Sequence, residues 1–209
     1  MNKLIAACLG LALLAGCAAT PDRSRQDDLA VVQRAAYRHD GPPALTLYTM
    51  INNRTGAGAH SSLMINGSQR VIFDPAGSVQ HSQIPERGDV LYGITPRIEE
   101  FYARAHARET FHVVIQRIEV DAATAEKALQ LAMENGAVSQ AFCAQATGAI
   151  LRQLPGFESI RPTFFPVGLS EQFGALPGVT SRTLRENDSD DKSEAIARFD
   201  AEQRARQGQ

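Results

Sequence analysis

Short apolar runs of strand length alternate along this chain with longer segments that have helical spacing. Residues 45–51 are rich in large apolar and β-branched side chains and precede Asn52-Asn53, which predicts a strand that ends in a turn. The apolar runs 63–65 and 71–73 flank the pair Asn66-Gly67, a pattern typical of a β-hairpin. Residues 111–120 predict a long strand, which we expect at the centre of a sheet.

Other segments space their apolar residues as amphipathic helices do. Asp121 stands in a capping position before one such segment, and Ser139 stands before the next. The predicted helices cover residues 97–108, 122–134, 140–154 and 169–176. These elements predict an α+β fold over residues 44–184, in which an antiparallel sheet packs against helices.

The N-terminus has the pattern of a secretory signal. A short positive region precedes the apolar stretch 4–14, which is too short to span a bilayer. Leu14-Ala15-Gly16-Cys17 resembles the lipobox of bacterial lipoproteins, in which the cysteine becomes the acylated first residue. This resemblance implies a signal peptide over 1–16, a lipid on Cys17 that binds the bilayer, and a tether over 17–43. The alternative is an ordinary cleaved signal with a coincidental cysteine.

The residue after the cysteine also resembles a lipoprotein sorting signal. Ala18 rather than an aspartate stands there, which implies the outer membrane, facing the periplasm. At the other end of the chain, 12 of the 25 residues from 185 to 209 are charged. We expect this segment to be a solvated, disordered tail, helical at most over 193–206, that folding does not need.

Charge and composition exclude several classes of function. The net charge is −2 and no basic cluster is present, so a nucleic-acid partner is not expected. Aromatic residues make up 6% of the chain and tryptophan is absent, which disfavours stacking platforms for bases or sugars. No Cys-x-x-Cys pair, phosphate-binding loop or dinucleotide motif occurs, so no metal or other cofactor is expected.

One thiol remains for chemistry in the folded domain. Cys8 leaves with the signal and Cys17 carries the lipid, which leaves Cys143. Cys143 falls in the first turn of its predicted helix, where free backbone N–H groups and the helix dipole stabilise a thiolate. A histidine such as His60 could take the proton of such a nucleophile. The alternatives are a buried structural cysteine and a loop histidine that bonds only to nearby backbone.

The order of elements around these two residues matches a known arrangement. A strand and a small-residue loop lead to His60, and a long strand and a helix lead to Phe142-Cys143-Ala144 at the start of a second helix. Over residues 45–154 this resembles the circularly permuted NlpC-type papain-like proteins, a group that includes lecithin:retinol acyltransferase. The resemblance implies a papain-like fold and a thioester mechanism with Cys143 as nucleophile and His60 as base. It also implies substrates with amide or ester bonds in peptidoglycan or lipids. The chain departs from the group at Gln140-Ala141-Phe142, where relatives often carry Asn or Thr.

A third group usually orients the base, and Asp74 is the candidate. If the hairpin loop is Asn66-Gly67-Ser68, then Ile65 pairs with Gln69 and His60 lies opposite Asp74. A loop of two or four residues places Phe73 or Pro75 there instead. Asp74 can also serve only to begin an Asp-Pro turn.

The remaining histidines carry less weight. We expect His39 in the tether, His81 and His106 on the surface, and His112 at the start of a strand. Two hypotheses follow from the whole pattern. One is an anchored cysteine hydrolase or acyltransferase that acts on amides or esters of the cell envelope. The other is a non-catalytic envelope lipoprotein that uses the same scaffold to bind a ligand or partner.

Overall fold

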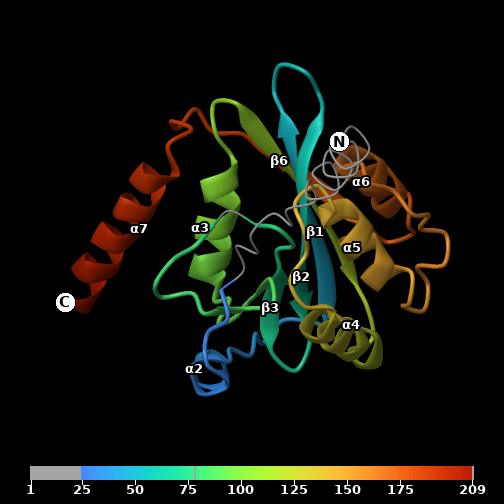
Figure 1. Cartoon of the computed structure of the whole chain (residues 1–209), viewed down its shortest axis with the longest axis horizontal. Coiled ribbons are helices and arrows are strands. Elements are labelled where there is room, and N and C mark those ends of the chain that lie inside the picture. The colour runs from blue at the N-terminus through green and yellow to red at the C-terminus, as the bar shows by residue number, and fades with distance from the viewer. Residues whose placement is uncertain (1–24, 78, 209) are drawn as a thin grey trace, which may run out of the picture.

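The computed structural model describes residues 25–77 and 79–208. The expected signal peptide, the expected lipid site Cys17 and the first part of the tether lie outside these residues. The described part of the chain forms a single antiparallel sheet with helices on both of its faces (Figure 1). The predicted fold class, α+β with an antiparallel sheet against helices, is therefore confirmed at this level.

Seven strands form the sheet in the order β4-β5-β3-β2-β1-β6-β7, and each neighbouring pair is antiparallel. They are β1 Ala44–Asn52, β2 Gly58–Asn66, β3 Arg70–Phe73, β4 Glu86–Arg87, β5 Val90–Leu91, β6 Phe111–Glu119 and β7 Thr180–Leu184. The first seven residues of β1 are all buried, because helices cover both faces of this strand.

The apolar sequence of the long strand β6 predicts a position at the centre of the sheet, but the strand does not lie there. It lies between β1 and the edge strand β7, and of its residues only Val113, Ile115 and Gln116 are buried. β7 carries the sequence Thr-Ser-Arg-Thr-Leu, whose mostly exposed side chains suit an edge and give no apolar signal.

Six helices occur in the described part of the chain. They are α2 Leu29–Ala35, α3 Pro96–His106, α4 Ala122–Asn135, α5 Cys143–Leu151, α6 Pro166–Gly174 and α7 Lys192–Gln207. Asp121 caps α4 as predicted, and its side chain accepts the Thr124 N–H at 2.7 Å. Within the described residues, no helix combines the length and the apolar character needed to cross a bilayer.

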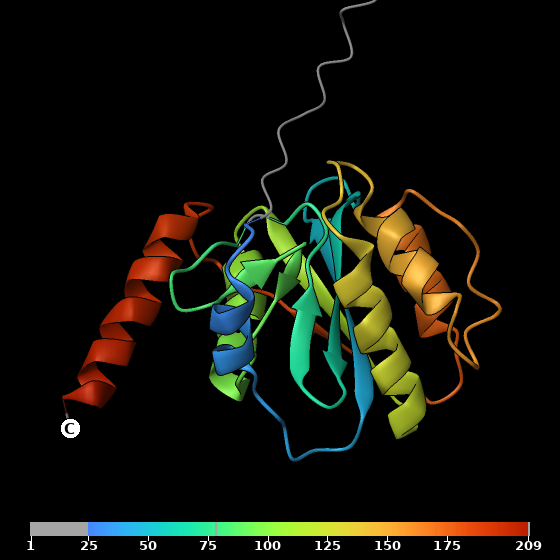
Figure 2. The same cartoon turned by 60° about the horizontal axis from the view of Figure 1, so that its bottom comes forward.

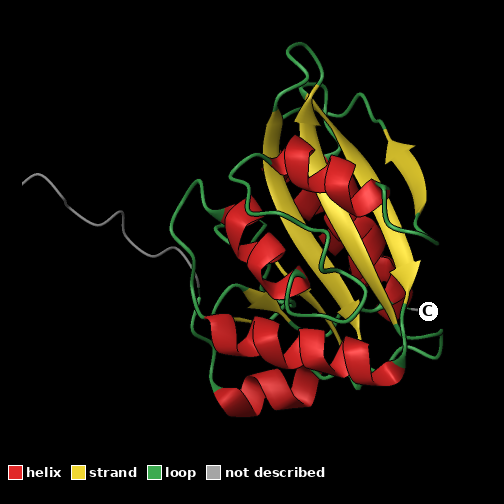
Figure 3. Ribbon diagram, turned by 90° about the vertical axis from the view of Figure 1, so that its right-hand side faces the viewer, coloured by secondary structure: helices red, strands yellow, loops and turns green. Residues whose placement is uncertain are grey.

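The helices divide between the two faces of the sheet. Figures 1 and 3 show α4, α5 and α6 together over one face, and α3 lies over the other. The alternation of the strands explains the division: Leu45, Leu47 and Leu63 join the core under α4, α5 and α6, whereas Tyr48, Met50 and Met64 join the core under α3.

The C-terminal segment is helical over the part where its sequence allows a helix, 193–206, but it is not the solvated, disordered tail that its charge predicts. Residues 192–207 form α7, which packs on the outside of α3 (Figure 2). Phe199 is 5% exposed and its ring stacks on Phe101 with centroids 4.4 Å apart. One buried aromatic ring, with Ala195 and Ile196 beside it and polar bonds such as His81–Asp200, therefore attaches a helix that has no apolar stripe, which is why the periodicity does not predict this contact.

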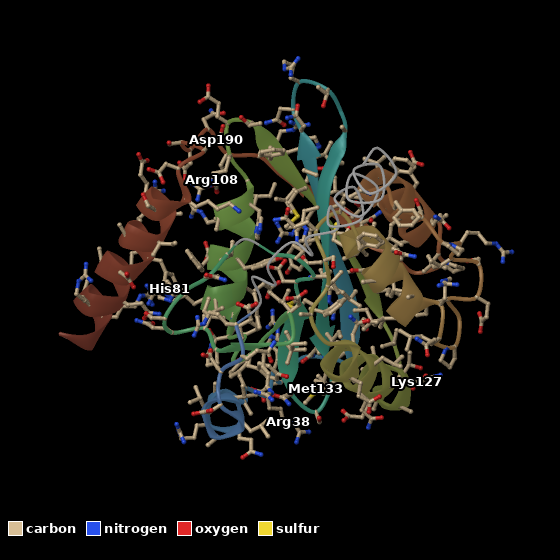
Figure 4. The ribbon with its side chains drawn as sticks, viewed as in Figure 1. Arg38, His81, Arg108, Lys127, Met133 and Asp190 are labelled. Carbon is tan, nitrogen blue, oxygen red and sulfur yellow. The ribbon has the colours of Figure 1, made fainter. Side chains whose placement is uncertain are left out.

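Residues 25–43 also pack on the domain, although they are predicted as a tether. Val32 in α2 is buried in the core, and the Tyr37 carbonyl accepts the Arg70 N–H at 2.7 Å. His81 and His106 are buried rather than exposed. His81 lies between α3 and α7 (Figure 4), where its ring contacts Phe101 and Phe199.

Candidate active site

The site forms where β2 extends beyond the end of β3. The last paired residues of the two strands are Leu63 and Phe73, so residues 58–62 of β2 have no strand partner on that side. His60 lies in this free stretch, opposite a bulge between Met50 and Ile51 of β1. The exposed backbone edge is therefore open to another element, and the Cys143 side chain at the start of α5 bonds to the Ser61 backbone there.

Cys143 is the first residue of α5. The expected cap Ser139 does not begin the helix; the N-cap is Phe142, which has no side chain that could accept a hydrogen bond. Ala141 before it has φ of +71°, in the left-handed region that non-glycine residues rarely adopt. This strained turn directs the chain so that the helix begins at the cysteine, and such strain is common at functional sites.

The thiol of Cys143 is a hydrogen-bond partner of the His60 imidazole. The backbone N–H groups of Ser61 and Ala144 also donate to its sulfur. Burial of the thiol opposes ionisation, but the hydrogen bond and charge of His60 together with these two N–H groups outweigh it. They lower the pKa of Cys143 below its usual value.

Asp74 binds the opposite side of the imidazole. His60 Nε2 lies 2.7 Å from Asp74 Oδ1, which leaves Nδ1 as the ring nitrogen for the thiol. The residues that the sequence predicts as a site, Cys143, His60 and Asp74, thus lie together in one hydrogen-bonded chain.

The predicted hairpin register is wrong by two residues, yet the contact forms. Asn66 pairs with Arg70, so the three-residue loop is 67–69 rather than 66–68. A shift of two keeps every side chain on the same face of the sheet. Asp74 therefore lies diagonal to His60, from the turn just beyond β3, and its carboxylate reaches the ring.

His60 and Asp74 stabilise each other's charged forms. Burial disfavours the imidazolium, but the charge and hydrogen bond of Asp74, with a smaller contribution from Cys143, raise the pKa of His60 to about 10. Burial likewise disfavours the carboxylate, but His60 and the Tyr102 hydroxyl lower the pKa of Asp74 to about 2. At neutral pH the site accordingly holds a carboxylate and an imidazolium next to the thiol.

Two further residues hold Asp74 in place. The Tyr102 hydroxyl lies 2.6 Å from Asp74 Oδ1 and 2.7 Å from Ser62 Oγ. Because a hydroxyl has one proton and a carboxylate only accepts, Tyr102 donates to Asp74 and accepts from Ser62. Tyr102 falls within the helix predicted over 97–108, and the sequence pattern does not identify this role.

His106 lies one helical turn after Tyr102 and stacks on His60, with ring centroids 6.1 Å apart and an interplanar angle of 20°. Its Nδ1 bonds to the Tyr102 carbonyl at 2.9 Å, and its buried Nε2 has no hydrogen-bond partner in the described structure. Burial, and then the charge of Lys192, lower the pKa of His106 to about 3, so this ring is neutral. The i, i+4 spacing of Tyr102 and His106 is the sequence signal that links them.

Asp89 connects the two loops that carry the site. Its carboxylate accepts the Ala76 N–H at 3.0 Å and the Val138 N–H at 2.8 Å. Its carbonyl accepts the Asp74 N–H at 2.7 Å. The turn after Asp74 and the loop before Cys143 are thereby fixed to a single buried residue.

The other histidines lie elsewhere. His112 begins β6 with its Nδ1 2.7 Å from Asn53 Oδ1, and the His39 ring accepts the Gly41 N–H at 2.9 Å. Throughout residues 25–77 and 79–208, no group of three His, Cys, Asp or Glu side chains is arranged to hold a metal ion. Cys143, His60 and Asp74 can together form a thiolate beside an imidazolium, which is the chemistry of a cysteine nucleophile.

Comparison with protein-family models, with curated proteins and with solved structures finds no match to this chain. The functional interpretation therefore rests on the geometry of the site.

Proposed function

We propose that this protein is a membrane-anchored thiol hydrolase or acyltransferase of the papain-like type that acts on amide or ester bonds of the cell envelope. The observation that carries the proposal is the hydrogen-bonded chain from Cys143 through His60 to Asp74. A nucleophile, a base and a group that orients the base are the minimum for acyl transfer through a covalent intermediate.

The proposed reaction has two steps. The Cys143 thiolate attacks the carbonyl carbon, a C–S bond forms and the electron pair of the carbonyl moves to its oxygen. The N–H groups in the first turn of α5, which have no side-chain cap, are the donors for this oxyanion. As the C–N or C–O bond breaks, the His60 imidazolium gives its proton to the leaving amine or alcohol, and a thioester remains.

In the second step, water or an acceptor hydroxyl attacks the thioester. Neutral His60 takes the proton of this nucleophile and the C–S bond breaks, which restores the thiolate and the imidazolium. Asp74 keeps Nδ1 of His60 directed at the sulfur throughout, because its bond to Nε2 fixes the orientation of the ring.

The order of elements supports the permuted NlpC-type arrangement within this proposal. A strand presents the histidine, the cysteine follows later in the chain at the start of a helix, and that helix packs on the same strand. A substrate in the membrane suits the same picture. If Cys17 is lipidated, the eight residue-to-residue steps from Cys17 to Arg25 can span at most about 29 Å, which holds the domain near the bilayer.

Active-site labelling tests the proposal. The full chain is incubated with p-nitrophenyl acetate, and the acyl adduct is mapped by mass spectrometry of peptides. We expect an acetyl group on Cys143 in the wild type and none in Cys143→Ser. Asp74→Asn should form the adduct at least about tenfold more slowly, because His60 loses its orienting charge. His112→Gln serves as a matched histidine control that should react like the wild type.

The second candidate function is a non-catalytic scaffold, and the low exposure of Cys143, 6%, is the observation in its favour. A structural thiol would remain unmodified in the folded protein and would react only after denaturation. That result would replace the enzyme proposal with the scaffold.

A further inference from the structure

An apolar surface adjoins the nucleophile. Five large hydrophobic side chains are exposed in the described part of the chain, and three of them gather at this site. These are Phe142 at 44%, Phe164 at 53% and Phe165 at 74% exposure, and the rings of Phe142 and Phe164 meet edge to face with centroids 5.6 Å apart. We call these three residues the aromatic patch.

The residues of the aromatic patch are chain neighbours of residues at both halves of the proposed site. Phe142 directly precedes Cys143, at a position where helices usually carry a polar cap. Phe164 and Phe165 precede Pro166, which packs on Gly58, two residues before His60. A Cβ at Gly58 would lie 2.8 Å from Pro166 Cβ, so this close approach requires the glycine.

A shallow groove of about 320 Å³ continues from Phe142 along the outer side of α5. Val138, Ala146 and Ala149 supply most of its remaining apolar lining, beside the polar side chains of Ser139 and Gln145. Arg152 closes the far end, ten residues after Phe142, which corresponds to about 15 Å of helix. The groove thus begins next to the nucleophile and is apolar over much of its length.

We infer that this groove and the aromatic patch bind the acyl chain of the substrate, so that the substrates are esters or amides of fatty acids rather than cell-wall peptides. The inference deepens the proposed function and rests on it. An acyl carbon bonded to Cys143 must direct its chain away from the sulfur, and the apolar surface starts there.

Hydrogen bonding favours an acyl chain over a peptide in this groove. Beyond its first turn, the backbone groups of α5 are bonded within the helix, so the groove offers an extended peptide mainly the side chains of Ser139, Gln145 and Arg152. A peptide would lose bonds to water without replacement, whereas a hydrocarbon loses none. A bound hydrocarbon would also cover the exposed rings of the aromatic patch, and removal of this apolar surface from water is favourable.

A chain-length series tests the inference. The rate constant for acylation of Cys143 in the full chain is measured with p-nitrophenyl esters of two, four, eight and twelve carbons. In the wild type, we expect the constant to rise with length, by at most about fourfold for each methylene that the groove covers. Phe165→Ser and Ala149→Glu should lower the ratio of the twelve-carbon to the two-carbon constant by about tenfold or more, because one removes apolar surface and the other places a charge in the groove.

Two matched controls introduce the same serine and glutamate at exposed positions elsewhere. Leu29→Ser on α2 and Ala123→Glu on α4 alter exposed positions away from the groove and should keep the wild-type ratio. Equal constants for all chain lengths, or equal ratios in groove variants and controls, would overturn the inference and leave the proposed function intact. Failure of every ester to acylate Cys143 would instead refute the proposed function, and the inference with it.

Discussion

At the scale of single residues, the site depends on charges that burial would otherwise suppress. His60 is 14% exposed and Asp74 is 3% exposed, and each remains charged because the other faces it at 2.7 Å. Tyr102 adds a donor to the same carboxylate at 2.6 Å. Removal of any one member therefore leaves a buried polar group without its partner, which costs more than the loss of one contact.

The stability of the protein should reveal this pair through its pH dependence. The pKa of His60 is raised from 6.5 to about 10 in the folded state, so its contribution is complete below pH 6.5 and is lost as the pH rises through 10. The pKa of Asp74 is lowered from 3.8 to about 2, so its contribution is present above pH 3.8 and is lost as the pH falls through 2.

The thiol of Cys143 titrates in the opposite sense, because its lowered pKa adds stability as the pH rises through the range of an ordinary thiol. We therefore compare variants that lack this thiol. The free energy of unfolding of Cys143→Ser, measured by urea denaturation, should fall between about pH 6.5 and 10 more steeply than that of Cys143→Ser combined with His60→Gln. His112→Gln in the Cys143→Ser background should keep the steeper slope, because the pKa of His112 is lowered from 6.5 and this group titrates below the range. Parallel curves for the first two variants would contradict the account of the pair.

At the scale of elements, α7 is the least expected part of the fold. Its contact with the rest of the domain is made mainly with α3, where Phe199 stacks on Phe101 and the Arg97 guanidinium lies 5.0 Å from the centre of the Phe199 ring. Lys192 at the start of the same helix is one of the charges that act on His106. The helix thus connects the C-terminal segment to the side of the site formed by α3.

Phe199→Ala should destabilise the domain, in contrast to the expectation of a dispensable tail. Loss of a buried ring should cost about 3 kcal/mol, which lowers the thermal midpoint by about 6–12 °C for a domain of this size. Phe165→Ala, which removes a ring that is 74% exposed, is the matched control and should change the midpoint little. An unchanged midpoint in Phe199→Ala would mean that α7 adds nothing to stability.

Several elements could be predicted because local signals determine them. Asp121 and Gly136 mark the ends of α4, and the apolar runs define β1 and the hairpin. The parity of the hairpin places His60 and Asp74 on one face even though the predicted register is wrong. The positions of β7, α7 and the burial of His106 depend on long-range packing, for which a single sequence gives no periodic signal.

At the scale of the whole molecule, we propose a folded domain that is anchored to a bilayer. The lipobox-like segment is the basis for this part of the proposal, and an anchor of several acyl chains on one residue would hold the domain at the membrane permanently. A substrate that carries a fatty acid would then lie in the same membrane as the enzyme.

Cys17→Ser should release the protein from membranes into the periplasm, because the proposed acyl anchor forms on that thiol. Fractionation of cells followed by a salt wash measures the distribution of the protein. Ser24→Ala, in the same N-terminal stretch, should remain with the membrane fraction. Retention of Cys17→Ser in washed membranes would place the anchor elsewhere.

The central claim is that His60 lowers the pKa of Cys143 and stabilises its thiolate. The rate of iodoacetamide alkylation as a function of pH tests it most directly, without knowledge of the substrate. An ordinary thiol with a pKa of about 8.5 loses about 200-fold in rate between pH 9 and pH 6. For the wild type we predict a clearly smaller loss of rate between pH 9 and pH 6 than this, and for His60→Ala the steep loss of an ordinary thiol. Protection of native Cys143 at every pH, or identical profiles for the wild type and His60→Ala, would contradict the account.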